Sequence, residues 1–145
     1  MNIKKETALK FLSNLKFCSK YLAIEYSEQL KDAEVYNCVL SRSDISPDEA
    51  LLLSKKWANP QINKSLLGRE DIVQYLQGLD PYHALLKARK IGRPEIWDLI
   101  LENEKVLAFL HEYDVTRAIS LSREIDFPEV YEIILGRPDV IKSLE

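Results

Sequence analysis

Residues 84–96 read ALLKARKIGRPEI, and related stretches lie at 50–62, ALLLSKKWANPQI, and at 118–130, AISLSREIDFPEV. The prolines of these stretches, Pro60, Pro94 and Pro128, are 34 residues apart both times (94 − 60 and 128 − 94). Polar, small, apolar and proline positions recur together, which a generic amphipathic pattern would not produce. A period of this length is typical of proteins built from stacked structural repeats.

Each copy predicts two helices followed by a short third one. Asp80 and Pro81 are an N-cap and a proline at the first helical position, and the apolar residues after them have helical spacing. Gly92 is expected to end this helix, and Pro94 to begin the next. A break is expected near Asn103. The other copies have these residues close to that position: Gly68, Gly136 and Pro138.

An earlier and shorter copy precedes these three. Residues 33–36, AEVY, match residues 128–131, PEVY, and Pro47 follows this copy closely, so that its last helix is shortened. We therefore expect an all-α fold, a short α-solenoid of about four stacked helical repeats with an N-terminal capping helix. A single domain spans 1–145, with these parts: the cap 1–18 and repeats at roughly 19–45, 46–79, 80–113 and 114–145. Repetition is expected because one unit alone cannot bury its apolar faces.

The stretch 87–102, KARKIGRPEIWDLILE, resembles the two-helix core of an ankyrin repeat, with alanine, basic residues, a glycine turn, and then glutamate, an aliphatic residue and a leucine-rich run. The resemblance recurs at 52–67 and 120–135. The chain departs from the ankyrin pattern in its opening, HALL at 83–86 instead of Thr-Pro-Leu-His, and in a step that is one residue longer. It is similar either to a degenerate ankyrin-type repeat or to a repeat of HEAT or armadillo style. Both families are binding scaffolds, so the resemblance implies a partner and no residue-level function.

The composition points to no enzyme class. The chain has 20 Lys and Arg against 23 Asp and Glu, a net charge of −3, which gives no general attraction to nucleic acid or anionic membrane. His83, His111, Cys18 and Cys38 have no neighbour at a metal-ligand spacing, and we expect no catalytic residue, metal or cofactor. The N-terminal helix is amphipathic, without the pattern of a signal peptide or a membrane span. We expect a reducing, cytoplasmic location, with no membrane partner.

One position directly after a buried aliphatic residue carries large amphipathic side chains in three of the four copies. Such rings either form a contact ladder for a partner or pack between repeats. The turns before the second helix also vary, and variable turns on a rigid scaffold suit recognition. The candidate partner-binding residues are Tyr36, Asn63, Trp97 and Tyr131 at the ring position and Arg93 and Phe127 in the turns.

Basic residues recur in two sets. Lys55, Arg89 and Arg123 form the first set and are the candidate contacts to phosphate if the chain binds nucleic acid. The second set is Arg42, Arg69 and Arg137, and acids beside it favour local pairing. We expect a protein-protein interaction module, adaptor or inhibitor, and the alternative is a nucleic-acid-binding repeat protein.

The last repeat carries apolar residues with no polar outer face after them: Val140, Ile141 and Leu144. A terminal solenoid unit needs such a face. We expect this edge to be covered by self-association or by the partner.

Overall fold

The computed structural model describes residues 4–62 and 66–145, and every regular element in these ranges is a helix. The expected all-α fold is confirmed. The chain divides into two compact units, residues 1–75 and residues 76–145. The stacking of all four repeats into one solenoid stays a prediction.

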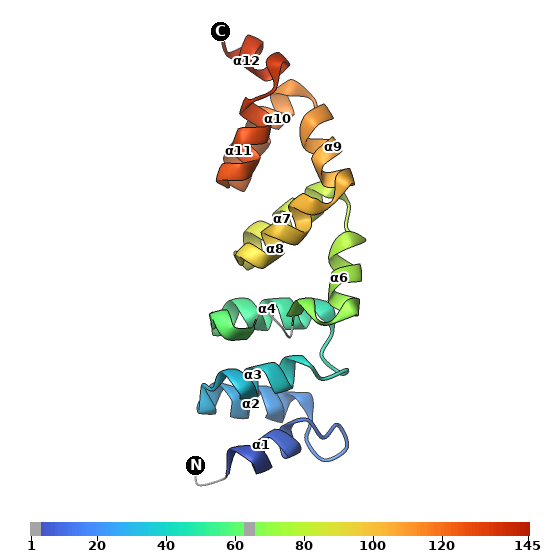
Figure 1. The fold of residues 1–145 in the computed structure, drawn as a ribbon, viewed down its shortest axis with the longest axis vertical. Coiled ribbons are helices and arrows are strands. Elements are labelled where there is room, and N and C mark those ends of the chain that lie inside the picture. Colours follow the sequence, from blue (N-terminus) through green and yellow to red (C-terminus); the bar gives the residue numbers. More distant parts are fainter. Residues whose placement is uncertain (1–3, 63–65) are drawn as a thin grey trace. The chain divides into compact units, whose positions relative to one another are not determined.

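The first unit consists of helices joined by short turns (Figure 1). α3 packs against both α1 and α2, and η1 packs against α3. In this unit α1 therefore packs against the second helix of the first repeat, and its role as an N-terminal cap stays a prediction. The elements are α1 (Lys5–Leu12), α2 (Lys20–Leu30), α3 (Ala33–Leu40), α4 (Pro47–Trp57), the 3-10 helix η1 (Pro60–Ile62) and the start of α6 (Glu70–Gln77).

The second unit contains two complete sets of three helices. α7 packs against α8 and α9, α10 packs against α11 and α12, and α9 and α11 join the two sets. The elements are α7 (Pro81–Ile91), α8 (Pro94–Glu102), α9 (Glu104–Glu112), α10 (Val115–Ile125), α11 (Pro128–Leu135) and α12 (Pro138–Leu144). The predicted break falls at Asn103, which ends α8 and caps α9.

The first helix of every repeat has the same length and the same caps. α2, α4, α7 and α10 are each 11 residues long. A side-chain oxygen before each helix accepts a hydrogen bond from the backbone N–H of its third residue, which stabilises the helix start. These N-caps are Ser19, Ser46, Asp80 and Asp114.

The same helices end in a left-handed residue. Gly92 has φ +73°, and three non-glycine residues occupy the equivalent place with φ near +50°. They are Lys31, Ala58 and Asp126. A left-handed cap turns the chain sharply back, so that the second helix lies against the first.

The three prolines occupy equivalent places. Pro60, Pro94 and Pro128 are each the first residue of the second helix of their repeat. The first repeat differs after its second helix, because residues 41–45 form only a turn before Ser46 caps α4. The sequence predicts that the last helix of this repeat is shortened, whereas in the structure that helix is lost completely.

An arginine joins consecutive helices at three equivalent places, and we call this arrangement the arginine clamp. Arg42 donates from Nη1 to the Leu12 oxygen and from Nη2 to the Cys18 oxygen, at 2.6 Å each, and also pairs with Asp44. Thus one guanidinium holds the end of the preceding helix and the residue before the N-cap of its own repeat. Arg69 holds Leu40, Ile45 and Asp71 in the same way, and Arg137 holds Leu110, Tyr113 and Asp139.

Candidate functional site

Two of the ring positions pack against the following repeat. Tyr36 stacks on Trp57 with ring centroids 4.4 Å apart, and Trp97 stacks on Phe127 at 4.1 Å with an interplanar angle of 8°. Tyr36 is 6% exposed and Trp97 is 5% exposed. Of the two interpretations of these rings, packing between repeats is the one that their geometry fits.

The other candidate contact residues have mixed environments. Arg93 is buried and pairs through Nε with Glu95, so it is no surface contact. Phe127 is half-buried under Trp97, and Tyr131 is half-buried with its hydroxyl donating to Asp126 at 3.0 Å. Asn63 lies outside the described residues. The buried Tyr36, Trp97 and Arg93 are packing residues, which corrects their assignment as surface contacts, whereas partner binding by the other candidates stays a prediction.

The two basic sets differ in their exposure. Arg42 and Arg137 are buried in arginine clamps, and Arg69 belongs to a clamp as well, so this set pairs locally. Lys55, Arg89 and Arg123 are exposed near the ends of α4, α7 and α10. Cations there complement the partial negative charge of a helix C-terminus.

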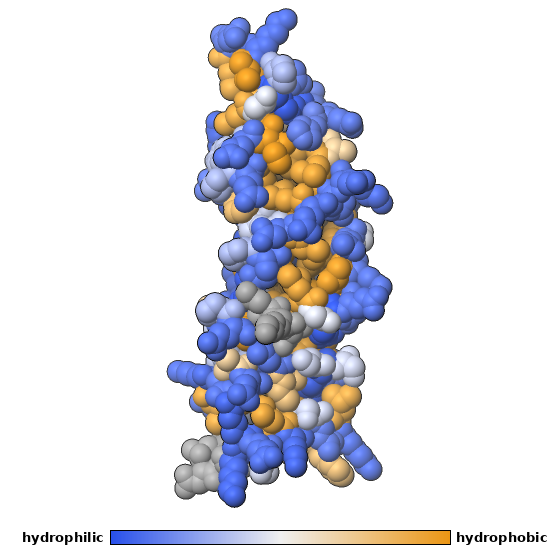
Figure 2. All heavy atoms as spheres, in the orientation of Figure 1, coloured by the Kyte–Doolittle hydropathy of each residue, from blue (hydrophilic) through white to orange (hydrophobic). Residues whose placement is uncertain are grey.

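The last helix exposes part of the predicted apolar edge. Leu144 is 60% exposed, whereas the equivalent residues Leu76 and Leu110 are 0% exposed. Ile141 is 47% exposed and Leu135, on α11, is 41% exposed. Val140 is buried, which corrects its assignment to the edge. Figure 2 shows hydrophobic atoms at the end of the molecule where Figure 1 draws α12.

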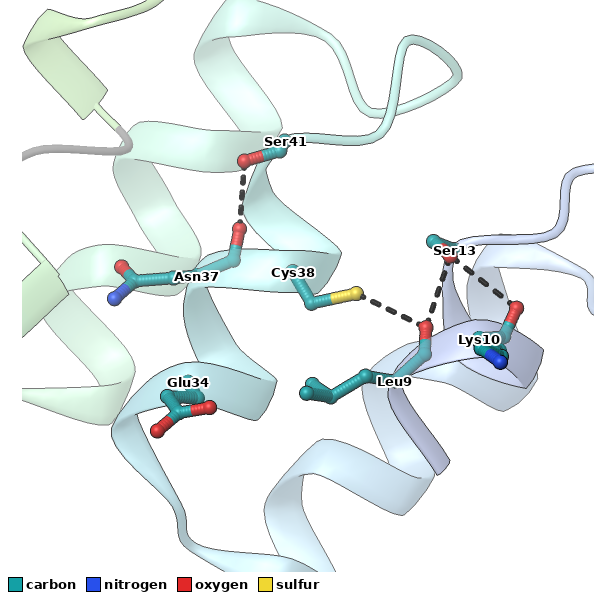
Figure 3. A pocket seen from close by; sticks show the side chains of 7 residues that line it. All are labelled: Leu9, Lys10, Ser13, Glu34, Asn37, Cys38 and Ser41. Atoms are coloured by element: carbon teal, nitrogen blue, oxygen red, sulfur yellow. Dashed lines mark hydrogen bonds between the residues drawn. The ribbon is translucent and has the colours of Figure 1, made fainter. Parts of the chain in front are cut away.

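A groove of about 450 Å³ lies between α1 and α3. Figure 3 shows Cys38 pointing from α3 toward α1, where its Sγ donates to the Leu9 oxygen at 3.4 Å. Burial raises the pKa of the Cys38 thiol, so it is a neutral donor at pH 7 and not a nucleophile. The groove combines apolar surface with charged and amide groups, and its lining is Leu9, Lys10, Ser13, Glu34, Asn37, Cys38 and Ser41.

The second unit has a groove in the equivalent place, of about 630 Å³. It lies where α9 meets α11, as the first lies where α1 meets α3. Glu132, Ile133 and Gly136 line it at the positions that Asn37, Cys38 and Ser41 occupy in the first groove. The clamp residue Arg137 forms one wall. The two grooves therefore share one framework but differ in the chemistry of their lining. No sequence signal indicated them.

The described residues contain no group of three or more His, Cys, Asp or Glu side chains placed to hold a metal ion. Among the helices of the described chain, none combines the length and the apolar character that crossing a membrane requires. Comparison of the chain with protein-family models, with curated proteins and with solved structures finds no match.

Proposed function

We propose that this chain is a protein-binding module, an adaptor or inhibitor without catalysis, built on degenerate ankyrin-like or HEAT/armadillo-style repeats and located in the cytoplasm. The observation that carries the proposal is the pair of equivalent grooves. Each groove lies beside an arginine clamp, since Arg137 lines the second and Arg42 directly follows Ser41 of the first, whereas the lining residues differ between the grooves. Recognition scaffolds divide their residues in this way, with a constant frame and variable contact positions.

The lining of each groove suits a polypeptide ligand. Both grooves combine polar and charged side chains with a few apolar ones, which bind side chains and main-chain groups of a peptide together. The first groove offers Lys10 and Glu34 at its borders, and the second offers His111 and Glu132. These different charges give each groove its own preference for partner side chains.

Affinity capture from native lysate with quantitative mass spectrometry tests the proposal. Wild type is compared with Ser41→Arg, which fills the first groove, with Glu132→Arg, which reverses a charge in the second, and with Glu25→Arg, a control on an exposed part of α2. We expect one or more proteins to be enriched by wild type and by the control, and to be reduced about tenfold by at least one groove variant. Equal capture by all four baits would contradict a groove contact. Unchanged circular dichroism of each variant excludes misfolding.

Self-association through the C-terminal edge is part of the proposal. Leu135, Ile141 and Leu144 expose apolar surface, and the residues equivalent to Leu144 in the two preceding repeats are buried. A second copy would shield this surface from water. Light scattering over a range of concentrations is expected to show a dimer for wild type and a monomer for Ile141→Glu/Leu144→Glu. A wild type that stays monomeric at the highest concentration argues against it.

Nucleic-acid binding is the alternative function. The exposure of Lys55, Arg89 and Arg123 favours it, because cations at a recurring position can follow a phosphate backbone. Binding to generic DNA or RNA that weakens steeply with salt, and that Arg89→Glu/Arg123→Glu abolishes, would support this alternative over protein binding.

A further inference from the structure

The segment Ser13–Tyr21, between α1 and the first turn of α2, exposes three large apolar side chains. Leu15 is 50% exposed, Phe17 71% and Tyr21 72%. The link leaves the helices of the first unit as an open loop (Figure 1). Such exposure means that these side chains protrude into solvent rather than line a groove, and exposed apolar side chains grouped in one short segment point to an interaction site.

The loop has a defined conformation. The Asn14 side chain accepts hydrogen bonds from the backbone N–H groups of Lys16 and Phe17, both at 3.0 Å. Arg42 holds the two ends of the link, through the oxygens of Leu12 and Cys18. A hydrogen-bonded turn therefore keeps Leu15 and Phe17 exposed to solvent.

The equivalent link in the next repeat shows which side chains this connection requires for folding. Residues 41–45 connect α3 to α4 and carry the clamp residues Arg42 and Asp44, with a serine between them. The link of residues 13–18 is one residue longer and has no arginine or aspartate. It carries Leu15 and Phe17 instead, exposed and without a packing role that explains them.

Lysine side chains lie beside these apolar side chains. No acidic residue occurs from Thr7 to Ile24, although the whole chain has net charge −3. The ammonium groups of Lys16 and Lys20 lie 5.4 Å from the ring centroids of Phe17 and Tyr21. Lys20 also pairs with Glu49 at 3.1 Å, while Lys10 and Lys16 are exposed. A lysine ammonium group therefore lies beside each of the two aromatic rings.

We propose that the Ser13–Tyr21 segment docks on the surface of an anionic lipid bilayer. Leu15 and Phe17 enter the apolar boundary of the bilayer, and Tyr21 lies at the headgroup level, where amphipathic rings are favourable. Lys10 and Lys16 contact the lipid phosphates. A deformable bilayer accepts protruding side chains without a matching cavity, whereas a protein partner needs a pocket for each ring.

Sedimentation of the full chain with vesicles tests this docking. Vesicles of phosphatidylcholine alone are compared with vesicles that also contain phosphatidylserine. We expect binding only to the anionic vesicles, weaker at high salt, and reduced about tenfold by Leu15→Ser/Phe17→Ser and by Lys16→Glu. The controls are Leu52→Ser and Lys55→Glu, an exposed leucine and an exposed lysine of α4, which are expected to bind like wild type.

A second measurement reports insertion directly. Phe17→Trp adds an indole to the two that wild type has, Trp57 and Trp97, and its emission after subtraction of the wild-type spectrum is expected to shift to shorter wavelength with anionic vesicles and not with neutral ones. Absence of wild-type binding to anionic vesicles at low salt overturns the proposal, as does equal binding by Leu15→Ser/Phe17→Ser. If wild type ignores vesicles but Phe17→Ser loses an acidic protein partner, the segment is a protein contact and lipid docking is wrong. Glu132→Arg, in the groove of the second unit, changes no residue of the segment and is expected to bind vesicles like wild type, so this test and that of the protein-binding function fail independently.

Discussion

The guanidinium of Arg137 donates from Nη2 to the main-chain oxygen of Tyr113 at 2.8 Å, across 24 residues of sequence. The same separation joins Arg42 to Cys18 and Arg69 to Ile45. The number of residues between the clamp arginine and its acceptor before the first helix is therefore the same in these three repeats. Between these two points each repeat has a first helix, a left-handed cap and a second helix.

Removing a clamp arginine should destabilise the unit that contains it. Arg42→Met leaves the oxygens of Leu12 and Cys18 without their donor in a buried place, and we expect a loss of about 2–4 kcal/mol in the free energy of unfolding. Arg137→Met should cost somewhat less and Arg69→Met least, because their side chains are 7% and 13% exposed against 1% for Arg42. Urea unfolding followed by circular dichroism measures the order.

The lysine variant separates charge from geometry. Arg137→Lys keeps the positive charge but cannot reach both oxygens and Asp139 at once, since an ammonium lacks the guanidinium fork. It should lose at least half of the stability that Arg137→Met loses. Full stability in Arg137→Lys would show that charge alone is needed and would refute the clamp.

The third repeat lacks a clamp arginine, because Asn103 and Lys105 stand where the others have arginine and aspartate. By the same spacing that joins Arg137 to Leu110 and Tyr113, an arginine at position 103 should reach the main-chain oxygens of Leu76 and Leu79. Asn103→Arg/Lys105→Asp should therefore raise the free energy of unfolding by about 1–3 kcal/mol, measured by urea unfolding. Lys105→Asp alone is the control and should give no gain. A double variant less stable than wild type would show that α9 cannot accept the clamp.

The left-handed caps predict a pair of opposite effects. Ala58 has φ +52° and Gly92 has φ +73° at equivalent positions. Ala58→Gly should stabilise the chain by about 1 kcal/mol because glycine removes the steric cost of a left-handed residue, and Gly92→Ala should destabilise it by about as much. Thermal unfolding of the two variants checks the signs. Effects of the same sign would contradict the assignment of both residues as equivalent caps.

The clamp aspartates predict sensitivity to acid. Hydrogen bonds from Arg42, Arg69 and Arg137 hold the pKa values of Asp44, Asp71 and Asp139 below their usual range. An aspartate in the unfolded chain has a pKa of about 3.9, so the folded state gains stability above that pH. This gain is lost as the pH falls from about 4 through the lower pKa values of the folded state.

Urea unfolding at several pH values measures this dependence. The triple variant with asparagine at positions 44, 71 and 139 should be less stable than wild type at pH 7, but should lose less stability between neutral and acidic pH. Glu25→Gln, at an exposed carboxylate, is the control and should follow the wild-type curve. Identical pH dependence of wild type and the triple variant would count against a stabilising role for the pairs.

The helices could be predicted from sequence because their signals are local. Asp80, Gly92 and Pro94 mark a helix start, a helix end and the next start within a few residues. The sequence predicts only a shortened third helix in the first repeat, because Pro47 indicates where α4 begins but not how many residues before it form a turn.

The roles of the recurring side chains needed three-dimensional information. Trp97 stacks on Phe127 in the next repeat, and nothing near either residue in sequence identifies the other as its partner. The recurrence of Arg42, Arg69 and Arg137 was visible, as was the nearby acid. Their acceptors are main-chain oxygens, which leave no trace in the amino-acid sequence. The grooves arise where helix ends meet and have no signature of their own.

Acceptors on the main chain have an evolutionary consequence. Every amino acid brings the same carbonyl, so the positions that receive a clamp are free to mutate as far as this bond is concerned. Neighbouring copies of the ancestral unit could therefore diverge in most of their side chains without losing their register. What this bond requires is the arginine and its separation of 24 residues from the acceptor, and three of the four repeats keep both.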